Sequence, residues 1–109
     1  MSSGMAVKPV TKRVVIPAAG TITLATVLGR DPKTWMGSLA IRAARANAND
    51  VFWRDEGGES GGYIGPGEAV SMDFGSGQAL IQNFTLVGAA SDVVFITVGL
   101  NRHYFTSEQ

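Results

Sequence analysis

The stretch that decides the fold is residues 93–100, with the sequence VVFITVGL. Val94, Ile96, Val98 and Leu100 fall on one side of an extended chain, and Val93, Phe95 and Thr97 fall on the other. Successive side chains of a β-strand point to opposite faces, so this alternation predicts a strand with one buried face.

Shorter segments repeat the pattern along the chain. Residues 69–74 place Val70, Met72 and Phe74 on one side, and residues 21–24 and 84–86 alternate more briefly. Turn signals separate these runs at 18–20, 29–32, 47–50, 57–67, 75–77 and 88–92. Six or more strands with such close punctuation predict an all-β fold, a single antiparallel β-sandwich that is jelly-roll-like or Ig-like.

One segment has two interpretations. Asp31-Pro32 followed by Ala-rich sequence to Ala48 is compatible with a capped helix, because Pro is favoured at the first helical position. Gly37 interrupts that pattern, and residues 38–45 also alternate as in a strand. We favour the strand.

Residues 55–67 contain six glycines between positions 57 and 67. Glycine brings no side chain to a core, so we predict a long Gly-rich loop there. Residues 1–10 are expected to form an irregular N-terminal arm, residues 11–105 the sandwich, and residues 106–109 a short tail.

Length and composition are those of one small domain. The chain has 109 residues, nine basic and nine acidic, with no cysteine. Absence of cysteine excludes disulfides, thiolate metal sites and a cysteine nucleophile. Charged residues make up 17%, below the roughly 25% of ordinary domains, which favours a surface that partners cover. Neutrality and scattered basic residues argue against nucleic-acid and membrane partners.

No motif in the sequence has the residue types and spacing of a catalytic, metal or phosphate site. Asp55, Glu56 and Glu59 lack the spacing of an EF-hand loop. His103 is the single histidine, and neither it nor the pair Ser91 and Asp92 is accompanied by a nucleophile-elbow motif. The glycines lack the Lys-Ser/Thr pair of a phosphate loop. We therefore expect no enzyme activity, no catalytic residue, no metal and no cofactor. Trp35, Trp53 and Tyr63 leave a sugar-stacking surface open as an alternative.

From Ser38 onward the chain resembles the small β-sandwich virion proteins of tailed bacteriophages, including capsid decoration (cement) proteins. Four blocks carry the resemblance in order, and they are residues 39–43, the aromatic run 51–55, the segment 63–73 with its Pro66-Gly67 turn, and the final hairpin 84–98. They cover about two-thirds of the chain. The Gly-rich insertion before Tyr63 departs from the family pattern.

The resemblance implies a structural role on the capsid exterior. Its expected partners are the major capsid protein and further copies of the chain in a small homo-oligomer, with a trimer favoured. A neck, tail or host-binding component and a carbohydrate-binding adhesion module are the alternatives. From position and apolarity, the expected contact residues are Val7, Pro9, Val10, Trp35, Tyr63, Ile64, Tyr104 and Phe105.

Overall fold

The computed structural model describes residues 7–58, 60–74 and 79–101. Nine strands lie within these ranges: β1 (Val7–Val15), β2 (Thr21–Thr23), β3 (Trp35–Ala43), β4 (Val51–Arg54), β5 (Ser60–Ile64), β6 (Ala69–Asp73), β7 (Ala79–Leu80), β8 (Thr85–Val87) and β9 (Val93–Asn101). A short helix, α1 (Leu24–Leu28), follows β2, and a 3₁₀ turn, η2 (Ile81–Asn83), precedes β8.

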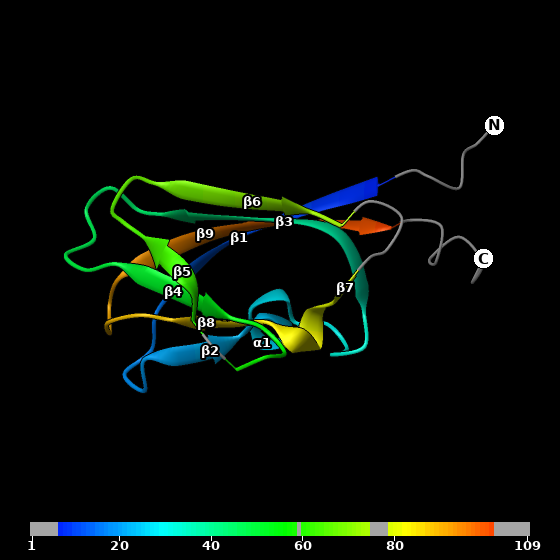
Figure 1. Cartoon of the computed structure of the whole chain (residues 1–109), viewed down its shortest axis with the longest axis horizontal. Coiled ribbons are helices and arrows are strands. Elements are labelled where there is room, and N and C mark those ends of the chain that lie inside the picture. The colour runs from blue at the N-terminus through cyan, green and yellow to red at the C-terminus, as the bar shows by residue number, and fades with distance from the viewer. Residues whose placement is uncertain (1–6, 59, 75–78, 102–109) are drawn as a thin grey trace.

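The strands form two antiparallel sheets that pack face to face (Figure 1). One is five-stranded, in the order β1-β9-β3-β6 with β7 beside β3, and the other is four-stranded, in the order β2-β8-β4-β5. The pairs β1 with β9, β2 with β8, β3 with β6 and β4 with β5 are nested like a long hairpin rolled onto itself. This is the jelly-roll arrangement. The predicted β-sandwich is confirmed, and its strand order is jelly-roll and not Ig-like.

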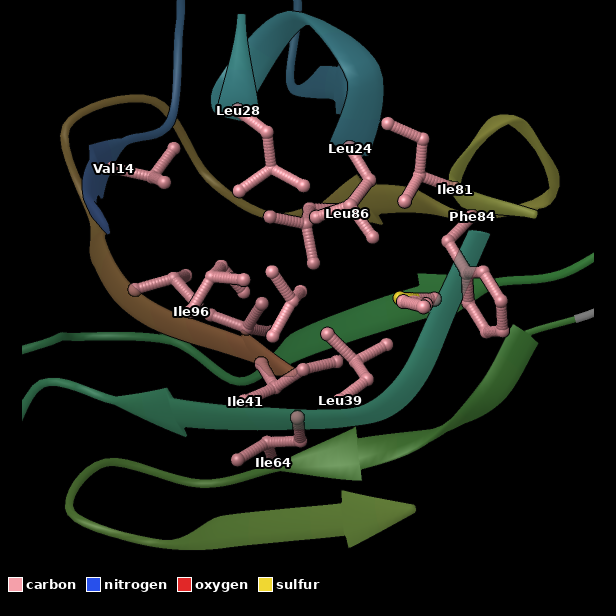
Figure 2. Close-up of a cluster of buried hydrophobic side chains, with 14 of the residues drawn as sticks. Val14, Leu24, Leu28, Leu39, Ile41, Ile64, Ile81, Phe84, Leu86 and Ile96 are labelled. Carbon is pink, nitrogen blue, oxygen red and sulfur yellow. The ribbon is translucent and has the colours of Figure 1, made fainter. Parts of the chain in front are cut away.

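The core lies between the sheets and follows the predicted alternation. Val94, Ile96, Val98 and Leu100 of β9 are fully buried, opposite Leu24, Leu28 and Leu86 from the other layer (Figure 2). Val70 and Met72 of β6, and Phe74 directly after it, pack against this cluster, as the sequence predicts.

The segment with two interpretations is strand β3. Its side chains alternate, with Met36, Leu39, Ile41 and Ala43 buried and Arg42 exposed. β3 pairs with β9 on one side and with β6 on the other, and this central position outweighs the helix propensity of its alanines.

Helix α1 was not expected, because residues 21–24 alternate like a strand. The Thr23 side chain accepts a hydrogen bond from the Thr26 N–H (3.2 Å) and ends the strand by capping the helix. Gly29, in the left-handed conformation, terminates the helix after five residues, and its N–H donates to the Ala25 carbonyl (2.9 Å). The helix buries Leu24 and Leu28 in the core.

Two predicted boundaries differ from the structure. Strand β1 begins at Val7 and pairs with β9 along its whole length, so residues 7–10 belong to the sandwich and not to an irregular arm. Residues 60–64, expected within the Gly-rich loop, form β5 at the edge of the four-stranded sheet. A glycine-rich segment can pair as a strand where a neighbouring aromatic ring covers its backbone.

Truncation of Ile96 tests the packing of the two sheets. Ile96→Ala is expected to lower the free energy of unfolding by about 2–5 kcal/mol, because a fully buried side chain leaves a cavity. Urea unfolding measures the change. Ser71→Ala, on the exposed outer face of β6, is the control and should shift stability by less than about 0.5 kcal/mol. Equal losses for the two variants would contradict the assigned inner and outer faces.

Candidate interaction surfaces

An aromatic row crosses the outer face of the four-stranded sheet. Thr21 is paired with Val87, Val87 with Phe52, and Phe52 with Tyr63. The rings of Phe52 and Tyr63 meet edge-on, with centroids 4.8 Å apart and an interplanar angle of 69°. Tyr63 is 74% exposed, the most exposed large apolar side chain in the described residues. The row therefore presents an apolar strip at the free edge of β5.

The indole ring of Trp53 lies against Gly61 and Gly62 of β5. A Cβ built on Gly61 would overlap the indole ring of Trp53, and one on Gly62 would approach Cη2 of that ring to 3.3 Å. The β4–β5 register shifts between Phe52 and Arg54, and Gly62 has a φ of 152°. Trp53 packs against the core beneath them. The glycines therefore leave room for the indole ring, which a side chain at either position would meet.

Acidic side chains lie at both ends of β4 and before β6. Asp55 and Glu56 follow β4, while Asp50 precedes β4 and Glu68 precedes β6. Glu68 Oε1 accepts the Gly65 N–H (2.8 Å), and Asp55 Oδ1 accepts the Gly57 N–H (3.0 Å). Arg54 and Arg45 are the basic side chains beside these carboxylates.

The outer face of the five-stranded sheet carries Arg13, Arg42 and Asp73. Phe95 points away from the core because Val94 and Ile96 point into it, and it is paired with Arg13 on β1 and with Arg42 on β3. Both arginines are exposed. Val15, 50% exposed, is paired with Val93 in the next row.

The predicted contact residues do not form one surface. Tyr63 is exposed as expected, and Trp35, 42% exposed, begins β3 in the other sheet. Pro9 is exposed, and Val10 is half-buried against the core. Ile64 is only 2% exposed, which corrects its prediction as a contact residue, because β5 alternates and turns it inward beside Tyr63.

The remaining predicted contacts lie outside the described residues. They are the side chain of Val7 and the residues Tyr104 and Phe105. His103, the histidine considered for catalysis, also lies outside the described residues. Sequence reasoning missed Phe95, Arg13 and Arg42, because their proximity depends on the pairing of three strands that are distant in the chain. The alternation places Phe95 outward but does not say what lies next to it.

The fold separates the three aromatic side chains of the expected sugar-stacking surface. Trp53 is packed inward while Trp35 and Tyr63 lie in different sheets, so these three rings form no shared platform. In the described part of the chain, no three His, Cys, Asp or Glu residues gather closely enough to hold a metal ion. No helix within the described ranges is both long and apolar enough to span a bilayer.

Comparison with known proteins gives structural likeness without a sequence family. No family model matches the chain, and no curated protein matches it. Among solved structures, the chain is similar to the cryo-EM structure of the giant freshwater prawn (Macrobrachium rosenbergii) extra small virus (XSV) VLP. The identity is 17%, the TM-score is 0.47, and the match covers 85% of this chain and 77% of that chain.

Substitution of Gly61 tests the close approach to Trp53. Gly61→Ala should destabilise the fold by about 1–3 kcal/mol, because the new methyl group must displace a packed ring. Chemical denaturation with tryptophan fluorescence measures both stability and the environment of the ring. In a Trp53→Ala background the same substitution should cost at least about 1 kcal/mol less, since coupled neighbours are non-additive.

Gly57→Ala is the matched control, because a Cβ there has only Asp55 Oδ1 nearby, at 3.4 Å, and Gly57 does not have a positive φ. A Gly61→Ala penalty that is unchanged when Trp53 is absent would show that the ring is not the reason for the glycine.

Proposed function

We propose that the chain is a non-enzymatic structural protein of a bacteriophage virion, a capsid decoration protein that binds the major capsid protein on the capsid exterior. The observation that carries the proposal is the pair of uncovered outer faces. One sheet exposes Tyr63 beside Phe52. The other exposes Val15 and holds the half-buried Phe95 between Arg13 and Arg42. Apolar and aromatic side chains on flat sheet faces are typical of surfaces that associate with other proteins.

The fold supports the proposal without deciding it. Jelly rolls occur in viral capsid proteins, and they also occur in lectins and cupins. The function therefore depends on the side chains that the two sheets present at their surfaces. The surfaces in the described ranges combine aromatic side chains with charged residues nearby, a composition that occurs in protein interfaces.

A small homo-oligomer around a symmetry axis of the shell, with a trimer favoured, completes the proposal. Several copies held together would bind the lattice by multiple weak contacts, and their combined affinity would exceed that of one copy. The edge strands β1, β5 and β6 offer unpaired backbone groups to neighbours.

Co-purification with virus particles tests this function. We expect the chain to sediment with intact heads and to be absent from separated tails, and a reconstruction of the particle to show it on the outer shell. Tyr63→Ala should weaken attachment at least about tenfold, because an exposed aromatic anchor is lost. Lys33→Glu, an exposed change outside both surfaces, is the control.

Stability should separate attachment from folding. Tyr63 is mostly exposed, so Tyr63→Ala should change the free energy of unfolding by less than about 1 kcal/mol. Recovery of the chain only in tail or neck fractions would contradict the decoration role and support a neck or tail component.

A carbohydrate-binding module is the second candidate, and the Phe52–Tyr63 pair favours it, because aromatic side chains supply rigid apolar contact surfaces for ligands. Binding to a glycan array that is abolished by Tyr63→Ala and Phe52→Ala would establish it. Uniform absence of glycan binding by a folded, particle-bound chain would exclude it.

A further inference from the structure

The free edges of the two sheets differ in what blocks them. Strand β2 has only three residues, and the pairing of β5 with β4 is interrupted by a register shift. Strand β1 carries Pro9, which has no N–H, and Lys12, which stays exposed at an inner-face position between Val10 and Val14. Proline and inward-pointing charges are devices that prevent further pairing at a sheet edge.

The proline of β1 faces the free edge. The Ile16 N–H donates to the Asp92 carbonyl (2.8 Å), and this bond continues the β1–β9 ladder, so the even-numbered positions bond to β9. The odd-numbered positions, including Pro9, therefore direct their backbone groups outward. One edge of the five-stranded sheet is thus interrupted by a residue that cannot donate a hydrogen bond.

Strand β6, at the opposite edge of the same sheet, lacks these devices. It contains neither proline nor a basic residue, and the side chains of Ala69 and Ser71 are small and exposed. The Ala43 N–H donates to the Glu68 carbonyl (2.9 Å), so the even-numbered positions bond to β3, and Ala69 and Ser71 direct their N–H and C=O groups outward. In the described part of the chain no hydrogen bond reaches these outward groups of Ala69 and Ser71.

The inner side of the β6 edge is apolar. Val70 and Met72 pack against the core but are only half-buried, and within the described ranges no strand lies beyond β6 to cover them. An extended strand with open backbone groups and partly covered apolar side chains has the features to which a further strand can be added.

We propose that β6 pairs with β6 of a second copy of this chain, antiparallel and about a two-fold axis at Ser71. Ser71 is the midpoint of β6, so this register gives all five residues of the strand a partner. Each Ser71 would exchange two backbone hydrogen bonds with Ser71 of the second copy. On the inner side each Val70 would lie opposite Met72 of the second copy, and the two apolar side chains would cover each other.

The same register suits the charges of the outer face. Within one copy Arg42 is paired with Ala69 and Asp73 with Ser38, at opposite ends of the β3–β6 ladder. In the proposed contact, Ala69 lies opposite Asp73 of the second copy, so Arg42 and that aspartate share one row with their Cα atoms about 10 Å apart. Arg42 can reach over the small Ala69 to this carboxylate, and no like charges are placed opposite each other.

A two-fold contact of this kind gives a dimer with one sheet continuous across both copies. It is compatible with the proposed trimer only where two trimers pair. The inference deepens the proposed function, and rests on it in taking the chain to act as a homo-oligomer, by naming the strand that joins two copies. Its tests use the purified chain alone, so they are separate from attachment to any particle.

Cross-linking tests the register. The chain has no cysteine, so one introduced cysteine reports one contact. Ser71→Cys would place two thiols at opposed positions with Cα atoms about 5.5 Å apart, within the range of a disulfide. Ala69→Cys is the matched control, because two such positions would lie roughly 14 Å apart along the paired strands. Under oxidation with diamide we expect Ser71→Cys to form the dimer at least about tenfold faster than Ala69→Cys, as measured by non-reducing electrophoresis.

Sedimentation velocity over a range of concentrations tests the association itself. Ser71→Pro removes the outward N–H at the centre of the contact and should weaken the dimer at least about tenfold, because two hydrogen bonds are lost. Thr11→Pro makes the same change at an outward, exposed position of β1 and should leave the dimer unchanged. Ser71→Lys, which sets two like charges opposite each other, is a second variant, with Thr11→Lys as its control. Circular dichroism checks that each variant is folded.

Three outcomes would overturn the proposal. They are an unmodified chain that stays monomeric up to about 1 mM, folded Ser71→Pro or Ser71→Lys variants that associate as strongly as the unmodified chain, and equal cross-linking of Ser71→Cys and Ala69→Cys. A chain that is monomeric in solution but binds the capsid would leave the decoration role standing. A dimer that binds no particle would remove that role and leave the β6 contact.

Discussion

The pairing of β9 between β1 and β3 is the constraint on which the rest of the structure depends. Its inward side chains Val94, Ile96 and Val98 are fully buried, and a slip of one residue would exchange them for Val93, Phe95 and Thr97. The core therefore holds the register of three strands. The same register places Arg13, Phe95 and Arg42 side by side on the outer face, so the burial of one face determines the surface of the other.

The four-stranded sheet has a different constraint, the close approach of Trp53 to Gly61. Gly61 lacks a side chain and the indole ring occupies the space, so β5 remains a strand at the sheet edge despite its composition. Ile64 then points into the core, and Tyr63 projects to solvent against Phe52. A segment that sequence composition assigns to a loop is thus a strand that carries Tyr63, the most exposed aromatic side chain of the described residues.

The charged residues of this neutral chain have defined positions on the two sheets. The chain has nine basic and nine acidic residues, so its net charge gives no long-range preference for a partner of either sign. The register of β1, β9 and β3 places Arg13 and Arg42 beside Phe95 on the outer face of the five-stranded sheet, and β6 adds Asp73 to the same face. Asp50, Asp55 and Glu56 lie at the two ends of β4 in the four-stranded sheet.

The sequence by itself determined the all-β sandwich and most of its core, because strand alternation has a local period that can be seen along the chain. It placed Val70, Met72 and Phe74 on one face, Ile96 and its neighbours on another, and Tyr63 outside. Tertiary structure alone decided two further features, the strand β5 and the neighbours of Phe95, whereas the short helix α1 has local end signals that the alternation of residues 21–24 obscured. Helix α1 depends on a hydroxyl cap and a left-handed glycine, and β5 depends on a ring from another strand. The arginines beside Phe95 come from strands about 80 and 50 residues away, and only long-range pairing brings such positions together.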